Sequence, residues 1–199
     1  VIRALNASLT PGRRDGSTGM LHGTTDYVLT MMDEEGMEYA DVLAEAQAKG
    51  YAEKNPAADV EGYDACRKIA ILSSLVYGKT VHYEDIYTEG ITKISKQDFL
   101  YAKAMKKSIK LLGMSKDIDG SCFAMVAPFM IRAEHPLYCV KDVFNGVCVH
   151  GNMLGDGMFY GSGAGKLPTA SAVVGDLVAM AKHVDKNIFL EWKEEKLEL

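Results

Sequence analysis

The chain has 199 residues, of which 48% are hydrophobic and 25% charged, so it can bury the core of one domain, or of one domain with an appendage. Its net charge of −5 and pI near 5.6 argue against nucleic acid and anionic membranes as partners. Because no apolar run reaches the roughly 18 residues of a spanning helix and no signal-peptide pattern opens the chain, we expect a cytoplasmic protein.

The first half of the chain is predicted to be mostly helical. A helix over about 1–9 leads through a turn at Pro11–Gly12 into a short strand near 16–22. Three further helices are expected over 25–35, 38–49 and 59–77, and each ends at a glycine. Pro56 bars a helix from continuing through it, and Asp59 is then the expected N-cap of the third helix.

The second half is predicted to be mostly strand. A short helix over 96–105 is accompanied by strands near 89–94, 108–118, 121–131, 138–150 and 156–161. Asp119–Gly120 predicts a two-residue hairpin turn. A glycine-rich turn then precedes a helix over 165–184. This order predicts the α+β class, with a mostly antiparallel sheet packed against helices and a C-terminal helix after the turn.

One row of side chains on the helix over 59–77 carries both charge and apolar bulk. Asp64, Lys68, Ile71 and Leu75 follow one another at helical spacing, so they share a face. Burying charge is costly unless the ions are paired, so this row indicates either a functional ion pair or an ordinary pair on the surface. The row alone does not separate the two.

Cysteine and histidine patterns predict no metal site. The four cysteines lie in apolar or helical surroundings without C-x-x-C spacing, so reduced core thiols are expected. The histidines show no metal-ligand spacing either.

Three motifs, in order along the chain, carry a resemblance to a known family. They are G-M-L-H-G-T-T-D-Y-V-L-T-M-M at 19–32, Y-A-E-K-N-P-A-A-D-V-E-G-Y-D-A-C-R-K at 51–68, and F-Y-G-S-G-A-G-K-L-P-T-A-S-A-V-V-G-D-L at 159–177. A shorter E-H-P-L lies at 134–137. Together they resemble homoserine dehydrogenase. That resemblance implies the NAD(P)H-dependent interconversion of L-aspartate 4-semialdehyde and L-homoserine, in threonine, methionine and isoleucine biosynthesis.

The resemblance assigns roles to residues of the first two motifs. It makes Lys68 the group that moves a proton on the C4 oxygen, with Asp64 orienting the ammonium and binding substrate. It also implies a set of further substrate ligands: Glu53, Asp59, Tyr51, Gly23 and Thr24. Each has a plain alternative, such as a solvated acid, an N-cap, a core tyrosine or a glycine required by the backbone.

The third motif is implied to approach the cofactor, NADP or NAD, through Gly163, Ala164 and Gly165. Free N–H groups at a helix N-terminus suit anionic groups, although a tight strand-to-helix turn would look the same. The chain opens at Val1 without a G-x-G-x-x-G unit of Rossmann type, so we expect residues 1–199 to be the catalytic and dimerisation domain only. Residues 161–184 would then face the nucleotide-binding domain, which would hold most of the cofactor.

Two functions of different classes remain. One is a homodimeric dehydrogenase; the other is an inactive module that dimerises and carries the substrate pocket. Three residues depart from the family pattern: His22 and Asp26 stand where asparagine is usual, and Asn55 where aspartate is common. For His22 a hydrogen-bonded structural role is the favoured interpretation, because Lys68 already fills the acid–base role.

Overall fold

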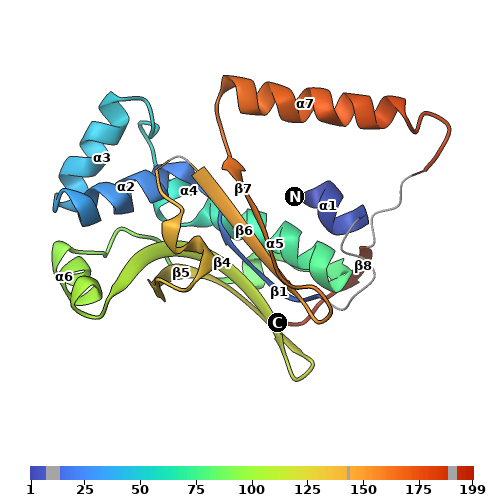
Figure 1. Cartoon of the computed structure of the whole chain (residues 1–199), viewed down its shortest axis with the longest axis horizontal. Helices are drawn as coiled ribbons and strands as arrows, with labels where there is room; N and C mark the ends of the chain where they lie inside the picture. The colour runs from blue at the N-terminus through green and yellow to red at the C-terminus, as the bar shows by residue number, and fades with distance from the viewer. Residues whose placement is uncertain (8–13, 143, 188–191) are drawn as a thin grey trace.

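The computed structural model describes residues 1–7, 14–142, 144–187 and 192–199. Its centre is a six-stranded sheet in the order β3-β5-β4-β1-β6-β7 (Figure 1). The strands are β1 Arg14–Met20, β3 Tyr87–Thr88, β4 Lys107–Ile118, β5 Ser121–Arg132, β6 Phe144–Gly151 and β7 Gly155–Ser162. Only β3 runs parallel to its neighbour; the other pairs are antiparallel. The predicted α+β class is confirmed.

The helices gather mainly on one side of this sheet. They are α1 Ile2–Ala7, α2 Gly23–Glu34, α3 Tyr39–Ala48, α4 Ala57–Val60, α5 Tyr63–Tyr77, α6 Lys96–Ala104 and α7 Lys166–Ala181. Short 3₁₀ turns, η1 Tyr83–Asp85 and η2 Pro136–Cys139, and a small parallel pair, β2 Lys79–Thr80 with β8 Lys193–Lys196, complete the described elements. Within the described residues, no helix combines the length and apolar character needed to cross a bilayer.

The main core forms where α2 and α5 pack on the sheet. Val28 and Ile69 are fully buried there, together with Val126 of β5. The predicted turn between β4 and β5 is confirmed, since Asp119 and Gly120 both take positive φ, at 53° and 87°. A second buried cluster lies on the opposite face of the sheet beneath η2: Met20, Leu112, Ile131, Leu137 and Val140.

The expected helix over 59–77 is wrong as a single element. Gly62 takes φ of 80° and separates α4 from α5. A Cβ there would lie 3.2 Å from Val126 Cγ1, so packing against the sheet also favours glycine. Asp59 therefore lies inside α4 and does not cap a long helix; the N-cap position of α4 is Pro56.

Two strand predictions also need correction. Residues 89–94 form no strand; the strand is the shorter β3, and Gly90 packs so closely on α4 that a Cβ would meet Val60 O at 2.1 Å. The run over 138–150 begins in η2, where His135 Nδ1 accepts from Leu137 N–H at 3.1 Å, and only later becomes β6. The turn at Pro11–Gly12 and the end of the first predicted helix lie outside the described residues.

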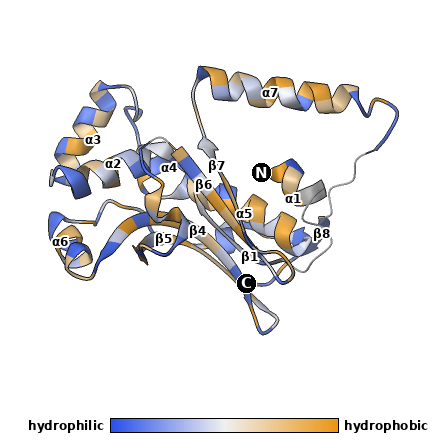
Figure 2. Cartoon of the chain, in the orientation of Figure 1, coloured by the Kyte–Doolittle hydropathy of each residue, from blue (hydrophilic) through white to orange (hydrophobic). Residues whose placement is uncertain are grey.

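The last long helix, α7, is set apart from the rest. It lies beyond the end of β7, and Figure 1 shows it separated from the sheet and spanning above α1. Figure 2 shows apolar residues along it, and its large apolar side chains are exposed: Leu167, Val173, Val174, Leu177, Val178 and Met180. Its described polar link to the body is Arg3, which lies 3.0 Å from Asp176 Oδ1 through Nε and donates to Gly175 O at 3.1 Å.

Candidate active site

The first turns of α5 place the predicted acid–lysine pair. Lys68 Nζ lies 2.7 Å from Asp64 Oδ2 and donates a hydrogen bond to the Leu21 carbonyl at 2.8 Å. The side chains are 44% and 33% exposed, which agrees with the expectation of partial burial. Ile71, further along the row, is also partly exposed, whereas Leu75 is buried. The ammonium is thus oriented by two acceptors while part of it remains open to a ligand.

His22, just before α2, brings two acids together. Its Nε2 lies 3.0 Å from Asp59 Oδ1 and 3.4 Å from Asp64 Oδ2. Burial lowers the pKa of His22, while Asp59 and Asp64 raise it and Lys68 lowers it further. Asp59 therefore reaches the same cluster as Lys68, although α4 and α5 are separate helices.

The start of α2 lies next to this cluster of charged side chains. Gly23 is its first residue, and Thr24 Oγ1 donates to the Tyr51 carbonyl at 2.7 Å. The ring of Tyr51 meets that of Tyr27 edge-on, with centroids 5.1 Å apart, and is otherwise half exposed. These contacts tie the segment before α4 to the N-terminus of α2, where backbone N–H groups lack helical partners.

Glu53 stands apart from this group. Its side chain is exposed, and its backbone carbonyl accepts a hydrogen bond from Gln47 Nε2 at 3.1 Å. Contacts described for this part of the chain do not link its carboxylate to Asp59, Asp64 or Lys68. The predicted substrate role of Glu53 stays a prediction.

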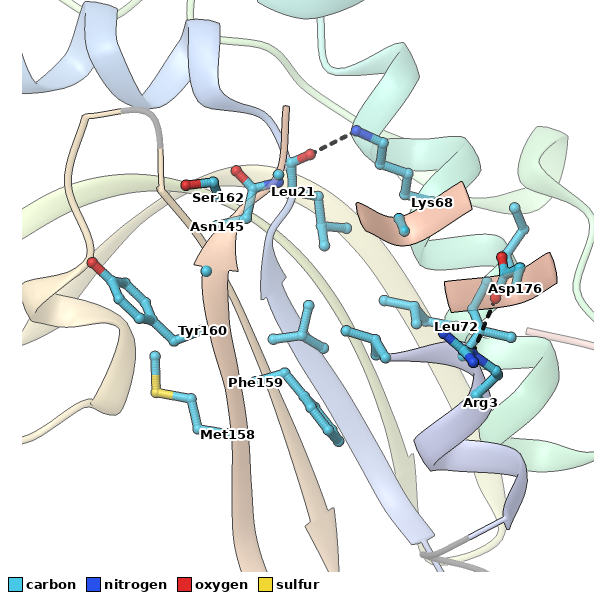
Figure 3. Close-up of a pocket in the computed structure, with 17 residues that line it drawn as sticks. Arg3, Leu21, Lys68, Leu72, Asn145, Met158, Phe159, Tyr160, Ser162 and Asp176 are labelled. Carbon is cyan, nitrogen blue, oxygen red and sulfur yellow. Dashed lines mark hydrogen bonds and ion pairs between the residues drawn. The ribbon is translucent and has the colours of Figure 1, made fainter. Parts of the chain in front are cut away.

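A cavity of about 980 Å³ connects Lys68 with the glycine-rich turn. Figure 3 shows Lys68 reaching the Leu21 carbonyl near Asn145 and Ser162, with the paired Arg3 and Asp176 elsewhere in the cavity; Gly161 and Gly163 also line it. The two motifs that lie farthest apart in sequence thus share one space. Polar groups on a partly apolar wall are typical of a small-molecule site.

Glycine is required in the turn for two different reasons. At Gly163 a Cβ would lie 2.2 Å from Asn145 Nδ2, so a side chain would displace the asparagine. Gly165, at the start of α7, has φ of 114° and ψ of 157°, a region that is essentially restricted to glycine. Ala164 between them is exposed, and neither it nor Gly165 lines the cavity.

The Leu21 carbonyl and Asn145 line the cavity without having been predicted. Asn145 pairs with Gly161 across β6 and β7, so its position depends on strand register. The role of Leu21 could not be predicted, because its contact with Lys68 uses the main-chain carbonyl, which every residue type has. Among the described residues, no cluster of three or more histidine, cysteine, aspartate or glutamate side chains is arranged to hold a metal.

A protein-family model, "Homoserine dehydrogenase", matches residues 1–178. Homoserine dehydrogenase of Mycobacterium tuberculosis is 47% identical over 188 residues, covering 92% of this chain and 43% of that protein. The corresponding Bacillus subtilis protein is 40% identical over 184 residues, covering 92% and 42%. This chain therefore spans less than half the length of these curated relatives.

Solved structures agree with the sequence comparison. A homoserine dehydrogenase from Thiobacillus denitrificans superposes with a TM-score of 0.92 at 36% identity, covering 99% of this chain and 47% of that one. A hyperthermophilic archaeal homoserine dehydrogenase mutant in complex with NADPH gives a TM-score of 0.76 at 26% identity, covering 92% and 52%. With most of its length matched by the family model, this chain belongs to the homoserine dehydrogenase family.

Proposed function

We propose that this chain is the catalytic and dimerisation part of an NAD(P)H-dependent homoserine dehydrogenase, which interconverts L-aspartate 4-semialdehyde and L-homoserine. One observation carries the proposal: Lys68, oriented by Asp64 and the Leu21 carbonyl, faces the same cavity as Gly161 and Gly163. Family membership supports the same reaction. The whole protein performs it, and this chain supplies the substrate side.

The residues divide the chemistry between them. Asp59 and Asp64 offer carboxylates to the substrate ammonium, which charge-assisted hydrogen bonds would hold. Lys68 would donate a proton to the C4 oxygen when the aldehyde is reduced and accept it back in the reverse direction. Leu21 and Asp64 keep Nζ in one position, so little reorganisation is needed at the moment of transfer.

The glycine-rich turn fits one end of a nicotinamide cofactor. At Gly161 nothing lies within 4 Å of an added Cβ, so a planar group can approach the backbone there, and the cavity extends from this residue to Lys68. The cofactor, when bound, supplies or accepts the hydride. Whether it is NADP or NAD is decided by ribose contacts, and we place these outside this chain.

We propose that residues 161–184 face the nucleotide-binding domain. The apolar residues of α7 are exposed along its length, which is unusual for a helix that remains in water. A domain packing on α7 would cover them and close the cavity over Lys68.

We propose that two chains form a homodimer through the face of the sheet that is turned away from α2 and α5. Phe123 projects from that face with 38% exposure, and Met158 and Tyr160, exposed at 41% and 58%, lie at its β7 edge, where they also line the cavity. Large exposed apolar groups on two strands of a broad sheet are typical of a surface that another sheet covers. The expected result in light scattering of the purified protein is twice the mass of one chain.

Substitution of Lys68 tests the catalytic proposal. In the full-length protein, Lys68→Met should lower kcat about 10²–10⁴-fold, because the group that moves the proton is lost. Lys93→Met is the matched control, since that side chain is 83% exposed and only approaches Glu89. If Lys68→Met retained more than half the rate while folding normally, the catalytic role would be wrong.

The alternative is that the 199-residue chain by itself is an inactive module. Ala164 and Gly165, which the resemblance assigns to the cofactor, are exposed and do not line the cavity, and this favours the alternative. Without adenine and ribose contacts, NADPH should bind at millimolar Kd or weaker, equivalent to about −4 kcal/mol. Calorimetry on the 199-residue chain checks this. Micromolar binding would mean that the chain holds a complete cofactor site.

A further inference from the structure

His22 occupies a position between acids that makes its protonation state consequential. A neutral imidazole has one N–H donor, and ionised carboxylates only accept. Because Nε2 faces both Asp59 Oδ1 and Asp64 Oδ2, the hydrogen of the neutral ring belongs on Nε2. Nδ1 is then a bare acceptor, and it is buried without a hydrogen-bond partner within the described residues.

The backbone of His22 holds the ring in place. Its carbonyl accepts hydrogen bonds from Thr25 Oγ1 at 2.9 Å and from the Asp26 N–H at 3.2 Å, both in the first turn of α2. The ring is also mostly covered, with 18% of the side chain exposed. The backbone from which the ring projects is therefore fixed at the start of α2, and the ring itself is enclosed by its neighbours.

Charged groups approach the ring from two helices. Asp59 comes from α4, while Asp64 and Lys68 come from α5. Burial and Lys68 lower the pKa of His22, and the two acids raise it, with burial the largest influence. The imidazole is accordingly neutral at neutral pH and gains a proton only in acidic solution.

We propose that His22 is a positioning residue that joins Asp59 and Asp64 for the substrate ammonium, and that its protonation puts a competing cation between the same carboxylates. This inference rests on the proposed function. Binding of one cation at the pair should disfavour the other, and the coupling is reciprocal. Homoserine should therefore bind more weakly as the pH falls, by up to tenfold per pH unit while His22 takes up its proton.

Two substitutions separate positioning from titration. His22→Asn keeps an amide N–H donor, at the depth of Nδ1 and short of Nε2, but cannot take up a proton, whereas His22→Leu removes the donor and retains apolar bulk. Calorimetry on the full-length protein would measure homoserine binding from pH 7.5 to pH 5.5. NADPH binding and the thermal midpoint, measured in parallel, report on global damage.

The expected results differ between the variants. The unsubstituted protein should lose homoserine affinity progressively as the pH falls over this range, whereas the affinity of His22→Asn should change less than twofold. His22→Leu should bind homoserine about tenfold more weakly at every pH, because a hydrogen bond to charged groups is lost. NADPH affinity should remain within twofold in both variants.

Other outcomes would overturn the inference. Equal pH dependence in His22→Asn and the unsubstituted protein would remove the competing-cation role. Unchanged homoserine affinity in His22→Leu, or equal loss of homoserine and NADPH affinity, would remove the positioning role. Failure of the unsubstituted protein to bind homoserine at any pH would instead overturn the proposed function, and this inference with it.

Discussion

The two ends of the cavity are built in opposite ways. Around Lys68, charged side chains are half-buried and held by neighbours from α4, α5 and the two residues just before α2. Around Gly163, the cavity is lined by two glycines and by uncharged side chains such as Asn145, and the helix that follows exposes its apolar side chains. In the proposed function, side chains at the first end perform the chemistry, and the second end offers a surface that another domain can cover. The proposed substrate end is therefore preorganised, whereas the proposed cofactor end is incomplete within this chain.

Truncation of one apolar side chain in each region tests this contrast most strongly. Ile69 of α5 is 0% exposed and Leu177 of α7 is 57% exposed. Ile69→Ala should destabilise the 199-residue chain by about 2–5 kcal/mol through the cavity it leaves. Leu177→Ala should stay within about 0.5 kcal/mol, since the side chain is exposed and alanine favours helix. Urea unfolding of the two variants measures both values.

The same pair in the full-length protein sharpens the comparison. If a nucleotide-binding domain covers α7, Leu177→Ala in the full-length protein should lower the free energy of unfolding by at least about 1 kcal/mol. This approaches the smallest losses measured when a buried leucine is replaced by alanine. A cost near zero in both proteins would contradict the proposed packing of that domain on α7. A large cost already in the 199-residue chain would mean that α7 packs on its own body.

The backbone of the turn gives a second, smaller effect. Gly165→Ala should cost about 1–3 kcal/mol, because φ of 114° with ψ of 157° suits only glycine. Crowding is not the cause, since the nearest atom to an added Cβ would be Pro168 Cδ at 3.6 Å. If the turn binds cofactor, KM for NADPH should rise about tenfold while KM for homoserine changes little.

Gly155→Ala is the matched control for backbone strain. Gly155 also has positive φ, at 74°, with nothing within 4 Å of an added Cβ, but it is the first residue of β7, just after the turn from β6. It should lower stability without changing either KM. Equal effects of the two variants on the KM for NADPH would argue that strain alone, and not the turn, affects binding.

Local rules explain what the sequence predicted well. The Asp64–Lys68 pair follows from helical spacing, and the Asp119–Gly120 turn from the need for two positive φ values. The class follows from the order of elements, and the family from motifs in that same order. These features depend on residues close together in the chain.

Contacts between distant segments explain what the sequence missed. Gly62 interrupts the predicted helix where the chain packs against Val126, more than sixty residues later. Asn145 reaches the turn through the pairing of β6 with β7. Asp59 keeps its predicted proximity to the site despite a wrong helix assignment, because His22 connects it to Asp64. Such relations require the folded sheet.

The buried carboxyl of Asp26 should make the stability of the protein depend on pH. Asp26 on α2 is 1% exposed, and neither carboxylate oxygen has a hydrogen-bond partner within the described part of the chain. Burial raises its pKa well above the usual value although Lys110, which donates to Val140 O at 2.8 Å, lowers it. Removal from water therefore outweighs the attraction of Lys110.

The sign of the pH effect follows from this raised pKa. The unfolded chain ionises Asp26 above about pH 4, whereas the folded chain retains the proton to higher pH. Stability contributed by the protonated carboxyl is thus lost as pH rises through the folded pKa.

Asp26→Asn cannot ionise, so with rising pH it should become progressively more stable than the unsubstituted protein, by about 1.4 kcal/mol per unit of pKa difference. Asp41→Asn, on the exposed side of α3, should show no such trend in urea unfolding between pH 4 and pH 8. A flat difference for Asp26→Asn would mean that Lys110 or bound water compensates the carboxylate after all.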